Sequence, residues 1–150
     1  MAETTRRVDH SGLRTGQALT IILLLAGFIL DSWLLVAVVA ISQLLGAWDA
    51  PFAPYRLFYK HVARRFVKPH VIADNPEPHR FAMLVGGVMN AVAVVALLAG
   101  ASTVAWVLVW IVIALANLNF WLNFCLGCWM YYQFNRLGVP GFARSPVRVE

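Results

Sequence analysis

The longest uncharged stretch of this chain constrains its fold more than any other feature. No Asp, Glu, Lys or Arg occurs between Phe81 and Asn135, a run of 55 residues. Asp31 is the only charged residue between Thr15 and Trp48. Of the 150 residues, 61% are hydrophobic and 13% are charged, whereas a soluble domain carries about 25% charged residues. Uncharged blocks of this length indicate helices that are embedded in a membrane.

The two uncharged regions divide into four predicted membrane-spanning helices. The first region is divided at Asp31, because one continuous helix would place this carboxylate near the bilayer centre at a cost of at least about 2.5–3.5 kcal/mol. A pair of re-entrant or interfacial helices is the alternative for this region. The second region is divided at Gly100–Ser102, the turn-like sequence in its middle. The predicted spans are residues 15–30, 32–48, 81–99 and 103–122.

The basic residues fall in three segments that four spans place on one side of the membrane. Of the 12 Lys and Arg residues, three precede the first span, six lie in the central loop and three follow the last span. Since Lys and Arg mark the cytoplasmic side, we expect both termini in the cytoplasm. This topology also accounts for the net charge of +5, so no nucleic-acid partner is predicted. We expect the first span to be retained, because no convincing signal-peptide cleavage site precedes Asp31.

The central loop predicts an amphipathic helix over residues 55–68. Aromatic and apolar residues recur at helical spacing on one face, and basic residues occupy another. The apolar set is Tyr55, Phe58, Tyr59, Val62 and Phe66, and the basic set is Arg56, Lys60, Arg64, Arg65 and Lys68. Such a helix lies in the inner leaflet, where each cation gains about 1 kcal/mol from anionic lipid headgroups. Docking of an acidic soluble partner or an anionic substrate is the alternative.

Two cysteines follow the fourth predicted span. Cys125 and Cys128 come 22 and 25 residues after Thr103, which is roughly 33–38 Å along a helix. Because the hydrocarbon core is about 30 Å thick, we place the pair at the cytoplasmic interface. A straight helix from Thr103 to Asn135 would be longer than the whole bilayer, so the helix must tilt or break. Gly127, between the two cysteines, is the candidate for the break.

The chemistry of the pair depends on that break. A helix that restarts near Cys128 presents its N-terminal dipole to the thiols and favours thiolate, whereas a continuous helix presents its C-terminal end and disfavours it. Thiolate is both the nucleophile and the metal ligand, so a C-x-x-C pair facing the cytosol predicts redox or sulfur chemistry. The same two cysteines could instead bind a soft ion such as Cu(I) or Hg(II), or zinc, or pack as small apolar side chains. No cofactor is required by the sequence, which leaves a soft metal ion or a quinone open.

Polar residues inside the spans suggest a pocket near the cysteines. On a continuous fourth helix, Asn117, Trp121 and Cys128 would share one face, and Asn90 lies on the third span. Asn117 and Asn90 are therefore candidates for a polar pocket that leads to the thiols. The alternative is ordinary hydrogen bonding between helices, worth about 0.6–2 kcal/mol each. No ionisable residue lies inside a predicted span, so an intramembrane proton or ion relay is not predicted.

Three segments carry a resemblance to a known family. They are DHSGLRTGQ at the first span, RFA before the third and NFCLGCWMYY after the fourth. The most specific element is F-C-x-G-C-x-x-Y, here Phe124, Cys125, Gly127, Cys128 and Tyr131. Over about residues 9–137 the chain resembles an uncharacterised bacterial membrane family, domain-of-unknown-function family 4395. The resemblance implies a small four-span protein of the bacterial cytoplasmic (inner) membrane, associated with thioredoxin-like and rhodanese-like sulfurtransferase proteins.

We therefore expect a single all-α membrane domain over residues 1–150. It contains four transmembrane helices, one cytoplasmic interfacial helix and a C-terminal tail over residues 137–150. The expected function is thiol–disulfide redox or sulfur transfer by Cys125 and Cys128 with a soluble thioredoxin-like or rhodanese-like partner, beside membrane lipids. Soft-metal binding or transport, and a non-catalytic role as a membrane subunit or assembly factor, are the alternatives. The substrate, the oligomeric state and whether the chain is an enzyme do not follow from the sequence.

Overall fold

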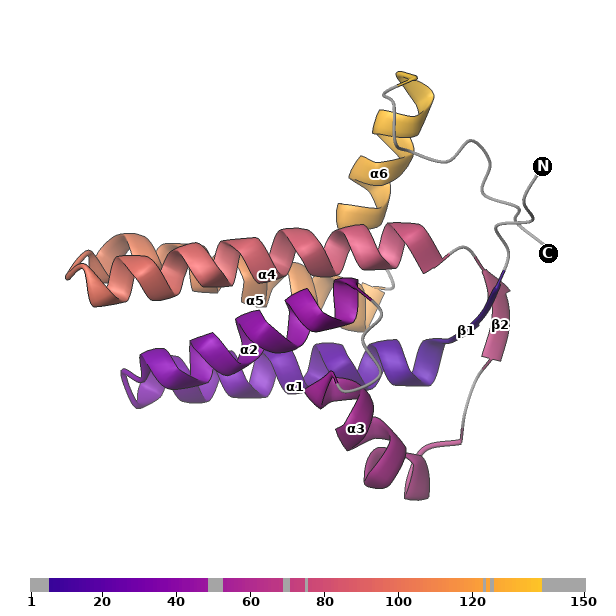
Figure 1. Ribbon diagram of the computed structural model, residues 1–150, viewed down its shortest axis with the longest axis horizontal. Coiled ribbons are helices and arrows are strands. Elements are labelled where there is room, and N and C mark those ends of the chain that lie inside the picture. Colours follow the sequence, from indigo (N-terminus) through magenta and orange to yellow (C-terminus); the bar gives the residue numbers. More distant parts are fainter. Residues whose placement is uncertain are drawn as a thin grey trace.

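The computed structural model describes residues 6–48, 53–68, 71–74, 76–122, 124 and 126–138, with the side chains of residues 6–9, 71–74 and 76–78 excepted. Four long helices lie side by side along the molecule (Figure 1). They are α1 (His10–Ile29), α2 (Trp33–Ala47), α4 (Pro76–Leu98) and α5 (Ser102–Leu122). Each helix coincides with one predicted span, and the largest differences are at the N-terminal ends of α1 and α4.

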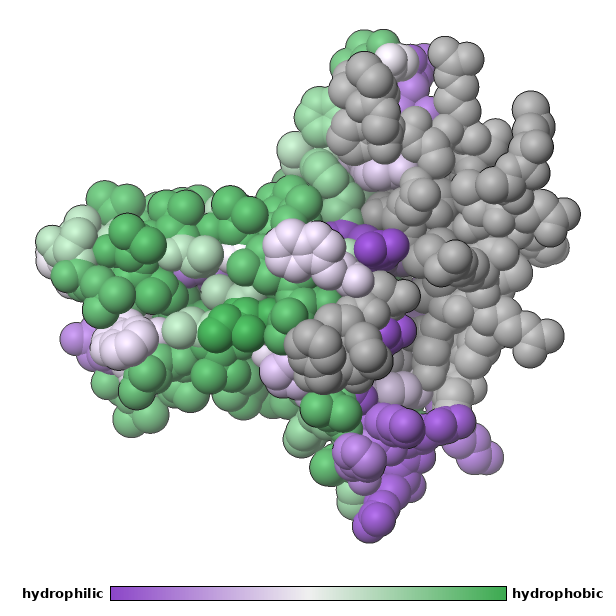
Figure 2. Space-filling model, in the orientation of Figure 1, coloured by the Kyte–Doolittle hydropathy of each residue, from purple (hydrophilic) through white to green (hydrophobic). Residues whose placement is uncertain are grey.

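The apolar character of these helices extends to the surface of the bundle. Helices α1, α4 and α5 are long and apolar enough to cross a membrane, and α2 is a shorter apolar helix of 15 residues. Large apolar side chains point outward, for example Ile29, which is 78% exposed, and Val95, which is 66% exposed. Figure 2 shows this apolar surface over the part of the bundle that contains the hairpin turns. The arrangement is consistent with a multi-pass membrane protein.

The interior of the bundle is apolar as well. Its fully or almost fully buried core contains Leu24, Val36, Val39, Ala93, Ala105, Val109, Val112 and Ile113. Helices α2 and α4 approach closely at Gly87, where an added Cβ would lie only 2.8 Å from Cγ of Leu44. A small residue is therefore required at this point of contact, as is common where membrane helices pack.

The two helical hairpins close with the same backbone motif, at the two predicted turns. After α1, the Ser32 amide donates to the Gly27 carbonyl at 2.8 Å and the Asp31 amide donates to Phe28 at 3.3 Å. After α4, Ala101 and Gly100 repeat this pattern. Both are Schellman caps, which need a left-handed residue after the helix. Gly100 fills that position with a φ of 86°, and Asp31 fills it with a φ of 48°.

The opposite end of the bundle carries the remaining elements (Figure 1). Helix α3 (Pro54–His61) and the short 3-10 helix η1 (Ala63–Arg65) follow α2. Strands β1 (Arg6–Asp9) and β2 (Val71–Asp74) then pair antiparallel, with Arg6 opposite Asp74 and Asp9 opposite Val71. The prediction of an all-α fold therefore missed a two-stranded ribbon, because strands of four residues leave no clear period in the sequence.

The predicted helix over residues 55–68 is shorter in the structure. Its α-helical part ends at His61, because the chain must turn back to pair β2 with β1. Ser11 at the start of α1 stabilises the returning segment before β2, because its hydroxyl donates a 3.0 Å hydrogen bond to the Lys68 carbonyl.

The fourth long helix ends before the cysteine motif begins. Helix α5 stops at Leu122, and a separate helix α6 (Leu126–Arg136) runs across the bundle direction (Figure 1). The break therefore precedes Gly127, and the prediction of a break at this glycine is wrong. The common face proposed for Asn117, Trp121 and Cys128 is also wrong, because it requires a continuous helix.

Candidate functional site

Cys128 occupies the first turn of α6 and is buried, with 8% of its surface exposed. Its Sγ lies 3.6 Å from Nδ1 of His79, which is in the first turn of α4. Cys125 lies outside the described residues. The structure thus brings one of the two predicted thiols to an imidazole that sequence analysis did not assign to the site.

Close packing of α6 on α4 makes this contact possible. A Cβ added to Gly127 would lie 2.6 Å from Cβ and 2.8 Å from Cα of Ala82, so only glycine fits there. The Phe81 ring packs against Tyr131 and Phe134, with ring centroids 5.9 and 6.3 Å apart. Gly127 is therefore a packing residue within α6. It holds the start of α6 against the start of α4.

A second imidazole extends the site to α1. His10, the first residue of α1, meets His79 edge to face, with ring centroids 5.8 Å apart. The first turns of α1, α4 and α6 therefore come together around His10, His79 and Cys128. Helix N-termini carry positive partial charge, and a neighbouring imidazole can accept a thiol proton. Both effects favour the thiolate form of cysteine in such a place.

Two arginines form hydrogen bonds with the C-terminal ends of α2 and α5. Arg80 Nε donates a 2.7 Å hydrogen bond to the carbonyl of Ala47, the last residue of α2. Arg14 Nη2 donates at 3.2 Å to the Phe120 carbonyl near the end of α5, and its guanidinium lies 5.7 Å from the Phe120 ring centroid. These cations satisfy carbonyl groups that a helix end otherwise leaves without partners.

The predicted lipid-contacting face lies on α3 and the segment after it. The side chains of Arg56, Lys60, Arg64, Arg65 and Lys68 are all exposed. Figure 2 shows hydrophilic residues gathered over α3 beside the apolar surface. Of the apolar set, Tyr55 and Tyr59 pack against α1 at Gly16 and Gly12. The other three residues of the set, Phe58, Val62 and Phe66, are exposed, and Phe66 is 84% exposed. Only this part of the predicted apolar face is therefore free to meet lipid.

Tyr55 reaches from α3 into the bundle. Its hydroxyl oxygen lies 3.0 Å from Thr20 Oγ1, and Thr20 Oγ1 lies 2.9 Å from the Gly16 carbonyl to which it donates. Burial raises the pKa of Tyr55 from 10.0 to about 12, and the hydrogen bond with Thr20 opposes this shift. The phenol is therefore neutral at physiological pH.

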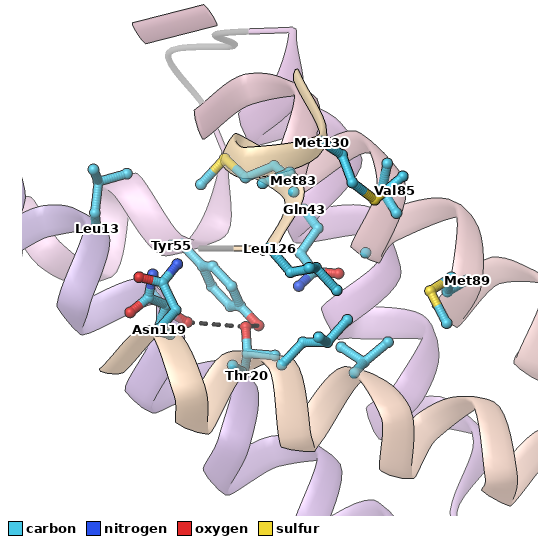
Figure 3. A pocket seen from close by; sticks show the side chains of 18 residues that line it. Leu13, Thr20, Gln43, Tyr55, Met83, Val85, Met89, Asn119, Leu126 and Met130 are labelled. Carbon is cyan, nitrogen blue, oxygen red and sulfur yellow. Dashed lines mark hydrogen bonds between the residues drawn. The ribbon is translucent and has the colours of Figure 1, made fainter. Parts of the chain in front are cut away.

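A cavity of about 140 Å³ lies beside the cysteine helix and is lined by residues from all six α-helices. Its polar lining includes Gln17, Thr20, Gln43, Tyr55 and Asn119, and its sulfur-containing lining consists of Met83, Met89 and Met130. In Figure 3, Tyr55, Thr20 and Asn119 lie toward one side, and Val85, Met89 and Met130 lie toward the other. Leu126 and Gly127 also line the cavity, so it adjoins the turn of α6 that carries Cys128.

The two predicted pocket residues have different positions. Asn90 is fully buried, and its Nδ2 donates a 2.9 Å hydrogen bond to Oε1 of Gln43, which lines the cavity. Asn117 donates to the Ile113 carbonyl of its own helix at 2.8 Å and is not among the lining residues. Asn119, on the same helix, lines the cavity instead.

The described residues provide no set of ligands for the alternative function, metal binding. Within the part of the chain that the structure describes, no group of three or more His, Cys, Asp or Glu residues is arranged to hold a metal ion. The described site therefore consists of one thiol, two imidazoles and the neighbouring cavity.

Fold and site together define a helical, membrane-type protein with a cysteine–histidine pair at one end of its bundle. The family model described as "Domain of unknown function (DUF4395)" matches residues 8–136, and the chain belongs to this family. No curated protein and no solved structure matches the chain. The second and third segments that carry the resemblance meet at the site through the contact of Gly127 with Ala82, and His10 of the first segment contacts His79, the residue before RFA.

Proposed function

We propose that this protein spans the bacterial cytoplasmic membrane four times, with both termini and the thiol site at the cytoplasmic face. Helices α3 and α6 extend from the same end of the bundle, as expected for helices at an interface (Figure 1). Helix α2 is about 22 Å long, which is short for a span. Local thinning of the bilayer accommodates a short span at modest cost.

The proposed activity is thiol–disulfide exchange or sulfur transfer by Cys125 and Cys128 with a soluble thioredoxin-like or rhodanese-like partner. The observation that carries this proposal is the 3.6 Å contact between Cys128 Sγ and His79 Nδ1 in the first turn of α6. A buried cysteine that only fills space needs no imidazole and no helix N-terminus beside it. These two features are those that activate a thiol.

The buried position of Cys128 assigns the two thiols different roles. Cys125 forms the mixed disulfide with the partner, and Cys128 resolves it. His79 Nδ1 takes the Cys128 proton, and the resulting thiolate attacks Sγ of Cys125. A Cys125–Cys128 disulfide forms, and the partner leaves as a thiolate that takes up a proton. The net reaction oxidises the pair and reduces the partner disulfide to two thiols. With a persulfide partner, the outer sulfur instead passes to a cysteine and the partner thiol is released.

Trapping of the mixed disulfide tests this assignment. Inside-out membrane vesicles carrying Cys128→Ser or Cys125→Ser are incubated with oxidised thioredoxin and separated under non-reducing conditions. We expect Cys128→Ser to accumulate the mixed disulfide, because Cys125 remains and cannot be resolved. Cys125→Ser should accumulate far less, since its remaining thiol is buried. Equal trapping in both variants, or none in either with both thioredoxin and a rhodanese persulfide, contradicts the proposal.

A further inference from the structure

We propose that the cavity beside α6 binds the ring of a quinol, an aromatic ring that carries hydroxyl groups. The proposal goes beyond the thiol chemistry and uses only the proposed membrane location, which gives lipid-soluble molecules access to the bundle. Three independent features of the cavity support it: its volume, its methionine side chains and its amide and hydroxyl groups.

The volume suits a single ring. At about 140 Å³, the cavity is close to the roughly 150 Å³ of an apolar cavity that binds benzene. Its lining is mostly apolar and includes a few polar side chains (Figure 3). Small-molecule sites have this combination, in which apolar surface provides affinity and a few polar groups fix orientation.

The methionines favour an aromatic ligand. The chain contains four methionines, and the three other than Met1 all line this cavity. Two of them come from α4, and Met130 comes from α6. Thioethers make favourable contacts with aromatic rings, and the flexible side chain of methionine adapts to ligands of different substitution. The labelled thioether groups in Figure 3 come from separate directions around the cavity, as needed to surround a ring.

The polar groups match the hydroxyl groups of a quinol. The amides of Gln17, Gln43 and Asn119 line the cavity, and an amide offers both an N–H donor and a carbonyl acceptor. The Tyr55 hydroxyl, which lies 3.0 Å from Thr20 Oγ1, adds a further polar group. A quinol hydroxyl can both donate and accept a hydrogen bond, so it can pair with these groups, whereas a hydrocarbon ring cannot.

Binding of methyl-1,4-benzoquinol to the full-length protein tests the proposal. The Cys125→Ser/Cys128→Ser double variant is used in lipid nanodiscs without oxygen, so that no thiol can react with the probe. Binding is followed by isothermal titration calorimetry, with toluene as the comparison ligand. We expect saturable binding of the quinol at least about tenfold tighter than that of toluene, from the hydrogen bonds that only the quinol can form. Equal affinity for the two ligands, or no saturable binding of the quinol, would overturn the proposal.

Two substitutions locate the binding to this cavity. Ala116 lines the cavity, and Ala114 on the same helix is exposed. Ala116→Leu should weaken quinol binding at least about tenfold by filling the space, while Ala114→Leu should leave it unchanged. Gln17→Leu should weaken quinol binding about fivefold to tenfold without changing toluene binding. Quinol affinity that is unaffected by both Ala116→Leu and Gln17→Leu would place the ligand elsewhere. Because the thiols are absent, this outcome is independent of the proposed thiol function.

Discussion

The contact between α4 and α6 makes Gly127 the most sensitive position of the thiol site. In Gly127→Ala, the new methyl group would lie 2.6 Å from Cβ and 2.8 Å from Cα of Ala82. Carbon atoms that are not bonded prefer separations of about 3.5–4.0 Å, so the two helices must move apart by about 1 Å. Because one of the obstructing atoms belongs to the backbone, a rotamer change cannot relieve the clash.

The expected cost follows from overpacking in a rigid contact. We expect Gly127→Ala to lower the free energy of unfolding by about 1–3 kcal/mol, although alanine is the better helix former. The same displacement would lengthen the 3.6 Å distance between Cys128 Sγ and His79 Nδ1 and weaken their interaction. In a Cys125→Ser background, Cys128 should therefore react more slowly with iodoacetamide at pH 7 than in the parent protein.

Gly12→Ala is the matched control for this experiment. It is also a helical Gly-to-Ala change, but its Cβ would lie 3.5 Å from the nearest Tyr59 ring atoms, an ordinary contact distance. We expect unchanged or slightly higher stability and an unchanged alkylation rate. Stability is measured by unfolding in a titration with sodium dodecyl sulfate, followed by circular dichroism. The alkylation rate is measured by mass spectrometry. If Gly127→Ala behaves as Gly12→Ala does in both assays, the assignment of Gly127 to the α4–α6 contact is wrong.

Three further predictions address the rest of the structure. Asp31→Gly should raise the free energy of unfolding by about 0.5–1 kcal/mol, because glycine adopts the φ of 48° with less strain, and a lower thermal midpoint would contradict this. Arg80→Met should lower it by about 1–2 kcal/mol through loss of the 2.7 Å hydrogen bond to the Ala47 carbonyl, in the same unfolding assay. Burial raises the pKa of Tyr55 to about 12 in the folded protein, against 10 for a free tyrosine. The buried neutral phenol therefore contributes its full stability below pH 10, and the folded state loses this contribution as pH rises from 10 to 12. Tyr55→Phe should therefore reduce the fall in thermal midpoint over that interval, and an unchanged fall would refute the assignment.

The long helices of the bundle could be predicted because they depend on local properties of the sequence. Apolar length and the position of Asp31 determine where helices end when the alternative is a charge in the bilayer. Gly100 likewise predicts its turn because a Schellman cap needs a left-handed residue. The ribbon and the early end of α3 could not be predicted in this way. They depend on a pairing between β1 and β2, whose residues are more than 60 positions apart.

The candidate site was predicted only in part for the same reason. The Cys128 thiol is visible in the sequence as half of a C-x-x-C pair, but its partner His79 lies 49 residues earlier and nothing near it marks a function. Gly127 was interpreted as a hinge because glycine commonly interrupts helices. Its close approach to Ala82 is a tertiary contact, which composition and spacing do not reveal.

The reactivity of Cys128 as a function of pH tests the central claim most directly. In a Cys125→Ser background, the alkylation rate is measured in inside-out vesicles with and without His79→Gln, and His61→Gln on exposed α3 is the control. We predict a half-maximal rate below about pH 8.5, the ordinary pKa of a cysteine thiol, and a shift of this midpoint to higher pH in His79→Gln but not in His61→Gln. A midpoint at or above pH 8.5 that does not respond to His79→Gln would contradict an activated thiol and leave Cys128 as a packing residue.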